Sequence, residues 1–357
     1  MRYAKILSSI ALLCAISFNS KAEINDALAP TSLPQDALTK PLHTVTIATN
    51  SLEESLLFYR EGMGLSVTGP YDSDKKVISI QRKLWDIPEE INWELYLMNR
   101  KEVAQTIQVR LLVLDRPTPS IHRSWNALEL GPFSLGFQNK DQEALDKKIR
   151  QLGFGSLNKL ESYQVPRPDK SLYSIDETIF NAPDFVHGVG IHRGGLMRQL
   201  GPVSSANGLG GPAYSAQMVE NSDEMLAFFI DVLGLELRSD RIWESAGSEG
   251  ALNVPDGTVF RFSIVYAKGA KTGHLLFVHY QNVDAIDNGI TPRLPNRGIG
   301  AWSFPVTDLD QVIKNAKTSK VQILQEPISY DSPALGNARV ATLLAPNGFL
   351  IELFEPL

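Results

Sequence analysis

The sequence predicts an α+β protein built from four copies of one unit, each a strand followed by a helix and three more strands. The first observation is a repeated phrase: residues 50–65 and 221–235 both follow an apolar run and both end in Gly-Leu. The second is a constant spacing, because the two long copies stay 167 residues apart from Pro88 and Pro255 onward. The third is a weaker repeat of 134–137 at 301–304 with the same offset. Such a repeat indicates a duplicated supersecondary unit.

The first 22 residues have the features of a secretory signal peptide. Arg2 and Lys5 precede an apolar run at 6–16, and Ser20-Lys21-Ala22 suits signal peptidase cleavage. The apolar run is too short to span a bilayer, and no second run of spanning length follows, so a membrane anchor is the weaker alternative. We therefore expect a periplasmic or secreted protein without a membrane partner. Residues 23–41, rich in Ala, Pro and Thr, are predicted to be a linker.

Composition then narrows the classes of partner. The single cysteine, Cys14, lies in the predicted signal peptide, so the mature chain has no disulfide and no thiolate ligand. Removing residues 1–22 takes away three basic residues and no acidic ones, which leaves 31 basic against 40 acidic residues, a net charge of −9. A chain this acidic, without a basic run, is not expected to bind nucleic acid. We expect a small-molecule ligand or substrate instead.

The first unit begins with a strand at 42–48. Ser51 and Glu54 then form a capping-box pattern at the start of a helix. The helix is predicted from a stripe of side chains at helical spacing, namely Leu52, Ser55, Leu56, Phe58 and Tyr59. Two glycines, Gly62 and Gly64, suit its end and the turn that follows. Strands are predicted at 91–98 and 106–113, from short β-branched and aromatic runs bounded by turn residues.

The remaining units repeat this order. The second has a strand at 134–137 and a helix at 141–152; the third has a helix at 221–233 and strands at 258–265 and 273–280. The fourth has a strand at 301–304 and a helix at 308–317. Ala-Pro turns at 182–183 and 345–346 precede the closing strands of the second and fourth units. A stretch rich in Gly, Ser and Pro, 194–212, is predicted to be an interdomain linker.

These residues resemble a known family. The strand at 42–48, the helix with Phe58-Tyr59 and Gly64-Leu65, and the closing segment 345–355 are similar to the vicinal oxygen chelate superfamily. That superfamily includes glyoxalases, extradiol dioxygenases, and fosfomycin and bleomycin resistance proteins. The resemblance implies four βαβββ modules paired into two cupped mixed-sheet domains, here 42–193 and 213–357. Because four modules suffice for two pairs, the chain is expected to be a monomer or a homodimer.

The resemblance also implies a divalent metal, held by residues on the first and last strands of the modules, usually His and Glu. The corresponding pairs in module order are His43 and Arg110, Ser134 and Val189, Tyr214 and Phe277, and Ala301 and Glu352. Of these, His43 and Glu352 are of ligand type. We therefore expect a degenerate site for iron, zinc, nickel or manganese, with Glu352 as the ligand and the usual His ligands missing.

The resemblance places the functional site in the cup of the C-terminal domain. The catalytic candidates there are His279, Glu352 and Tyr214, with His279 suited to act as a base near neutral pH. The candidates for substrate binding are Phe277, Arg261, Trp302 and His43. Arg261 would pair with an anionic substrate or with Glu352, or would face outward. Aromatic packing in the core is the alternative role for Trp302.

Three functions remain open from the sequence. One is an enzyme related to extradiol dioxygenases or glyoxalase-type lyases and isomerases, with a degenerate metal site. The alternative is a metal-free protein that binds or sequesters a small molecule, like the resistance proteins of the family. The third is a metal-independent acid–base enzyme that uses His279, Tyr214 or Glu352.

Overall fold

The computed structural model describes residues 36–357 except 73, 104–105, 167–170, 195–199 and 248–249. The predicted signal peptide and most of the linker at 23–41 lie outside the described residues. The last part of that linker packs against the fold, because Thr39 is fully buried and bridges to Val306. No helix in the described part of the chain has the length and apolar character needed to cross a bilayer.

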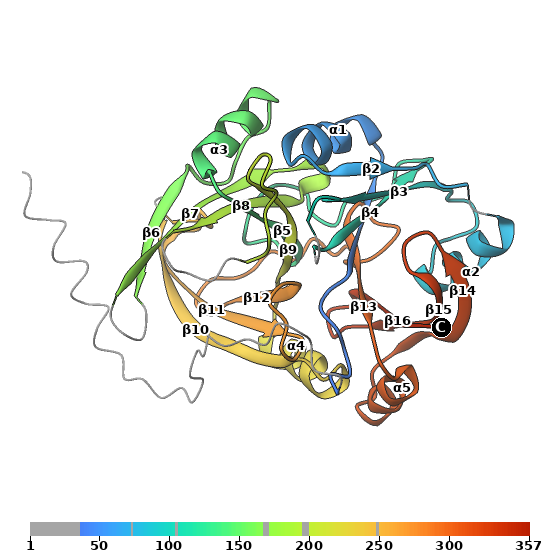
Figure 1. Cartoon of the computed structure of the whole chain (residues 1–357). Coiled ribbons are helices and arrows are strands. Elements are labelled where there is room, and N and C mark those ends of the chain that lie inside the picture. Colours follow the sequence, from blue (N-terminus) through green and yellow to red (C-terminus); the bar gives the residue numbers. More distant parts are fainter. Residues whose placement is uncertain (1–35, 73, 104–105, 167–170, 195–199, 248–249) are drawn as a thin grey trace, which may run out of the picture.

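The first eight-stranded sheet joins the first and fourth modules (Figure 1). Its strands lie in the order β14-β15-β16-β13-β1-β4-β3-β2. The first module contains β1 (Thr44–Thr49), α1 (Leu52–Leu56), the π-helical turn η3 (Leu57–Gly62), β2 (Ser66–Thr68), α2 (Lys75–Trp85), β3 (Trp93–Asn99) and β4 (Gln108–Leu114). The fourth contains β13 (Gly298–Pro305), α5 (Leu309–Thr318), β14 (Ile323–Ser332), β15 (Gly336–Leu344) and β16 (Leu350–Pro356).

The second eight-stranded sheet joins the second and third modules and curls strongly in Figure 1. Its strands lie in the order β10-β11-β12-β9-β5-β8-β7-β6. The second module contains β5 (Gly131–Asn139), α3 (Gln142–Gln151), β6 (Glu161–Pro166), β7 (Leu172–Asn181), the 3-10 turn η4 (Pro183–Phe185) and β8 (His187–Arg193). The third contains β9 (Leu209–Met218), α4 (Ser222–Ala227), the π-helical turn η5 (Phe228–Val232), β10 (Glu236–Ala246), β11 (Asp256–Tyr266) and β12 (His274–Tyr280).

The α+β class and the four modules are confirmed, but the expected pairing of neighbouring modules is wrong. The sheets do not follow the segments 42–193 and 213–357, because β1 pairs with β13 and β5 pairs with β9, both antiparallel. The two connections between β4 and β5 and between β12 and β13 cross from one sheet to the other, and they bridge each other at Ser120 and Arg297. Each first strand offers an open edge, and antiparallel pairing satisfies it whichever module supplies the partner.

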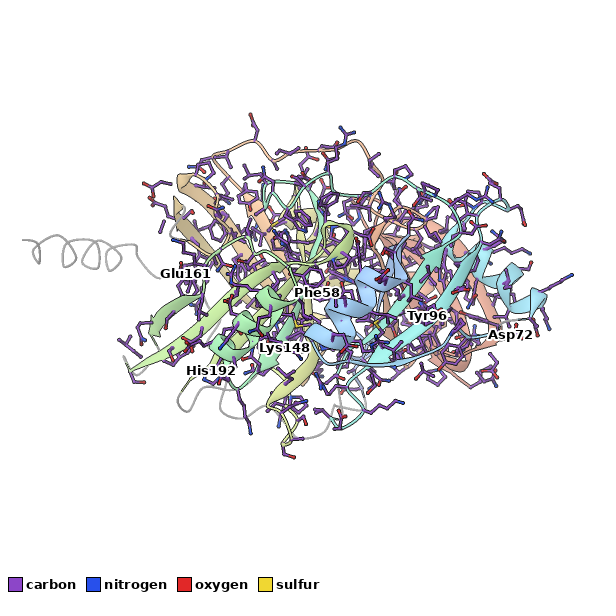
Figure 2. All side chains as sticks on the ribbon, turned by 90° about the horizontal axis from the view of Figure 1, so that it is seen from above. Phe58, Asp72, Tyr96, Lys148, Glu161 and His192 are labelled. Carbon is purple, nitrogen blue, oxygen red and sulfur yellow. The ribbon has the colours of Figure 1, made fainter. Side chains whose placement is uncertain are left out.

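The helices begin where the sequence predicts. Ser51 accepts a hydrogen bond from the backbone of Glu54, and Asn221 caps α4 in the same way. The largest core contains the buried faces of these helices and one face of both sheets. Figure 2 shows Phe58 of this core between the two halves of the molecule, with Glu161 and Asp72 at opposite ends. The other faces of the first and second sheets have cores of their own, and we call them the concave faces.

One helix was not predicted. α2 begins after Asp74, whose side chain accepts a hydrogen bond from Val77, and it lies against β14 and β15 over the concave face of the first sheet. Its buried residues Ile80, Leu84 and Trp85 have helical spacing, but they precede Pro88, where the constant spacing of the repeats begins, and so they found no helical counterpart in the other copy. The predicted linker at 194–212 is also shorter than expected, because β9 already begins at Leu209.

Candidate functional site

Glu352 lies at the centre of the concave face of the first sheet. Ser303 on β13 lies opposite Glu352, and further along the sheet Thr46 on β1 lies opposite Arg110 on β4; all four residues are fully buried. Arg110 Nη2 lies 2.8 Å from Glu352 Oε2, and Ser303 Oγ donates to the same oxygen at 2.6 Å. Arg110 Nε donates to Thr46 Oγ1 at 2.9 Å. The carboxylate therefore has a buried cationic partner within the chain.

Helix α2 closes this centre from above. Trp85 Nε1 donates to Glu352 Oε1 at 2.8 Å. The Arg110 guanidinium lies over the Trp85 ring, 4.6 Å from its centroid, in cation–π geometry. Both carboxylate oxygens are thus hydrogen-bonded, and both charges are shielded from water. We call Arg110, Glu352, Ser303, Thr46 and Trp85 the Arg110 cluster.

The expected metal positions need a small correction. Ser303, rather than Ala301, lies opposite Glu352, and Thr46, rather than His43, lies opposite Arg110. Within the described residues, no group of three or more His, Cys, Asp or Glu side chains is placed to hold a metal ion.

A pocket of about 410 Å³ lies at the edge of this concave face, beside the ends of β3 and β4. Gln108 is two residues before Arg110 on β4, so the two side chains share a face. The lining residues are His43, Asn99, Arg100, Lys101, Val103, Thr106 and Gln108. A larger groove of about 560 Å³ lies along α5 and β14, but it is remote from both concave faces and lined mainly by exposed polar side chains.

His43 is half-buried at this pocket. Its Nδ1 lies 2.8 Å from Thr44 Oγ1, and its ring meets Phe354 edge-on with the centroids 5.2 Å apart. Burial lowers the pKa of His43, and the positive charge of Arg110 lowers it further, against the opposing effect of Glu352. The imidazole is therefore neutral at pH 7, and it can offer one donor and one acceptor.

The concave face of the second sheet carries a row of stacked side chains. The Arg238 guanidinium lies 4.3 Å from the centroid of Tyr266, which stacks on His274 at 4.6 Å; His274 stacks on Tyr214 at 5.0 Å. Tyr214 in turn covers Gly136, where any Cβ would lie 1.8 Å from the Tyr214 ring. Close approach of the ring therefore requires glycine at 136.

Glu177 lies on the same face as this row, because it is two residues before the core residue Ile179 on β7. Burial raises the pKa of Glu177 to about 7, and the charge of Arg193 opposes that shift only in part. At the centre of this face, the register pairs Ala216 with Leu276 and Gly136 with Val189, all apolar or small. This face thus lacks the charged centre of the first sheet.

The structure separates most of the predicted site residues. Glu352 lies in the first sheet and Tyr214 on the concave face of the second. Phe277 and Trp302 belong to the main core, where their ring centroids are 6.3 Å apart, and Trp302 Nε1 donates to Ser215 Oγ at 3.0 Å. This arrangement corresponds to the packing alternative for Trp302.

His279 and Arg261 lie opposite each other on β12 and β11, on the face of the second sheet that meets α4. His279 Nδ1 is 3.2 Å from Ser222 Oγ. Arg261 forms ion pairs with Asp223 at 2.6 Å and with Asp240 at 2.7 Å, rather than with Glu352. Of the predicted residues, His43 and Glu352 are close enough to interact electrostatically near the first sheet, whereas Phe277 with Trp302 and His279 with Arg261 form separate neighbouring pairs elsewhere.

Sequence reasoning missed the partners of Glu352. Arg110 was identified as the last-strand residue paired with His43 in the implied metal site, but not as an ion-pair partner. Its signal was present, because an arginine in the apolar strand 106–113 must be neutralised if that strand is buried. The hydrogen bond from Trp85 to Glu352 could not be predicted from the sequence, since the helix α2 that carries Trp85 was not predicted.

Comparisons with known proteins agree with this fold. Glyoxalase I from Zea mays has a TM-score of 0.57 with 14% identity, covering 89% of this chain and 92% of that one. Its V278E mutant gives 0.58 with 14% identity and the same coverage. A putative dioxygenase from Bacillus subtilis gives 0.50 with 10% identity, covering 89% of this chain and 85% of that one. No family model and no curated protein matches the sequence.

At such low identity these likenesses establish the fold alone. The chain has the fold of these glyoxalase and dioxygenase structures, with four modules in two mixed sheets, and the sequence analysis expected this fold class.

Proposed function

We propose that this chain binds a small polar molecule without a metal ion, in the pocket beside the Arg110 cluster. The proposal follows the metal-free alternative of the sequence analysis. The observation that carries it is the buried ion pair of Arg110 and Glu352, 2.8 Å apart. The predicted signal peptide supports a location in the periplasm or outside the cell. Because each sheet is complete within one chain, the pocket needs no second chain.

The residues at the sheet centre do not fit a divalent metal. The four facing positions hold Thr46, Arg110, Ser303 and Glu352, which offer one carboxylate and a guanidinium. Iron, zinc, nickel or manganese would have to displace Arg110 from Glu352. A buried guanidinium without its counter-ion would then remain, at a cost of several kcal/mol. We therefore assign no step to a metal.

The pocket offers unused hydrogen-bonding groups. Asn99 Oδ1 and Gln108 Oε1 are buried, and within the described residues neither has a hydrogen-bond partner. An unpaired buried acceptor costs about 1–3 kcal/mol, so a ligand that supplies donors gains this energy on binding. Neutral His43 adds a further polar group at the same pocket. These groups support a polar ligand rather than an apolar one.

The test is mass spectrometry of the purified mature protein. We expect metal well below one equivalent per chain, and a co-purifying small molecule that Gln108→Leu loses. Gln322→Leu, which changes an exposed glutamine away from the pocket, is the matched control and should keep it. One equivalent of metal per chain, lost on Glu352→Ala, would contradict the metal-free proposal. A ligand retained fully by Gln108→Leu would contradict the choice of pocket.

A further inference from the structure

We infer that the ligand of this pocket is a small anion, a carboxylate or phosphate that also carries hydroxyl or amino donors. This inference rests on the proposed function and adds the chemical class of the ligand. The seven lining residues include two permanent cations, Arg100 and Lys101, and no carboxylate. The whole chain has a net charge of −6, so the positive charge of this pocket is opposite in sign to that of the chain. A pocket lined in this way attracts an anion.

Arg100 provides the strongest argument. The residue is only 3% exposed, and none of the ion pairs of the described residues includes it. Nη2 donates to the backbone oxygen of Met63, whereas Nε has no partner there. Desolvating a cation without a counter-charge is costly, and a bound anion would compensate for part of that cost.

The surrounding charges leave this cation largely uncompensated. Glu102 favours the charged form of Arg100, but its own side chain is exposed to solvent, where water screens its charge. Lys148 of α3 is close enough for Arg100 to disfavour its charged form. Lys101 is exposed at the pocket itself. Glu61 favours the charged form of Lys148, so three cations, Arg100, Lys101 and Lys148, stand against two carboxylates, Glu61 and Glu102, and neither carboxylate lines the pocket.

The neutral groups of the pocket define the rest of the ligand. Asn99 Oδ1 and Gln108 Oε1 accept hydrogen bonds, so the ligand must bring O–H or N–H groups to them. A volume of about 410 Å³ is in the range of ordinary small-molecule sites. A hydroxylated carboxylate or a hydroxylated phosphate fits both requirements.

The experiment compares two probes that share a skeleton, D-gluconate and sorbitol, which differ in one carboxylate. We expect gluconate to bind about tenfold more tightly by calorimetry, with an affinity that falls as salt rises. Inorganic phosphate and acetate, run beside them, distinguish the two kinds of anion.

Lys101→Gln should weaken gluconate binding several-fold and leave sorbitol unchanged. Lys83→Gln, at an exposed lysine of α2, should change neither. Arg100→Lys keeps the charge and provides a second variant, because Arg100→Gln risks the fold through the lost bond to Met63. Circular dichroism checks that each variant is folded.

Equal binding of gluconate and sorbitol, lost in Gln108→Leu, would overturn the anion inference and leave the proposed function standing. No binding of gluconate, acetate or phosphate at millimolar concentrations would also overturn it. The mass-spectrometric test of the proposed function is independent of both results.

Discussion

Replacing Arg110 by Met should destabilise the protein by about 3–5 kcal/mol, because the change leaves the Glu352 carboxylate buried without its counter-ion. At 2.8 Å and an effective dielectric of about 20, the attraction between the two charges is about 6 kcal/mol. Trp85 and Ser303 still donate to the carboxylate, so part of its solvation survives. The net loss should therefore fall below the full attraction.

The double variant Arg110→Met/Glu352→Leu removes both charges at nearly constant volume. It should cost only about 1–2 kcal/mol, chiefly for the unpaired indole N–H of Trp85. Glu352→Leu alone leaves Arg110 buried without its counter-ion and should also cost about 3–5 kcal/mol. The two changes should thus be strongly non-additive, with a coupling energy of about 4 kcal/mol or more. Urea unfolding followed by far-ultraviolet circular dichroism measures all the free energies.

The control is Arg339→Met, which breaks the partly exposed ion pairs of Arg339 with Glu355 at 2.9 Å and with Asp310 at 2.6 Å. It should cost less than about 1 kcal/mol, because solvent screens both pairs. If Arg110→Met costs no more than Arg339→Met, or if the double variant costs the sum of its single changes, the buried pair does not hold the sheet centre as argued.

Three further predictions concern the rest of the molecule. Burial lowers the pKa of His187 from its usual 6.5 to about 3. As the pH falls from 6.5 towards 3, the unfolded chain is protonated at this histidine before the folded chain is, so the free energy of unfolding should fall. His187→Gln should flatten that part of the pH profile of thermal melting. For Glu177 the pH dependence of stability has the opposite sign, because burial raises its pKa from 4.5 to about 7. Its contribution to the free energy of unfolding is fully present below pH 4.5 and is lost as pH rises through 7. Glu177→Gln should therefore be more stable than the native chain at pH 8 and equal to it at pH 4. Gly136→Ala should cost about 1–3 kcal/mol or more in thermal denaturation, because its Cβ would lie 1.8 Å from the Tyr214 ring, whereas Gly155→Ala, with its nearest atom at 3.3 Å, should be nearly neutral; equal losses would contradict the packing argument.

Local sequence patterns were enough to predict most of the helices and strands of the fold. The cap at Ser51 and the helical spacing after it depend on residues a few positions apart, so both copies of that helix could be placed from the sequence. α2 was not predicted, because the elements of the first unit were derived from the repeat and α2 has no counterpart in the other copy. An insertion into one copy is hidden when the other copy is used as its template.

Only part of the candidate site could be predicted from the sequence. His43 and Glu352 were identified, and the structure places both beside Arg110. Phe277, His279 and Arg261 were assigned to a cup, but they project from the opposite face of their strands. A shift of one residue along a strand moves a side chain to the other face, so a small error in register changes the lining of a site.

By itself the sequence determined the module, its fourfold repetition and the fold class, because these follow from short-range periodicity and turn chemistry. Only the tertiary structure decided that the first module pairs with the fourth and the second with the third. It also decided that Glu352 is neutralised by a residue 242 positions away in the chain. In backbone hydrogen bonding alone, the first strand of one module can pair equally well with the first strand of any other module. The choice among them therefore depends on packing and charge across the whole molecule, which no local pattern contains.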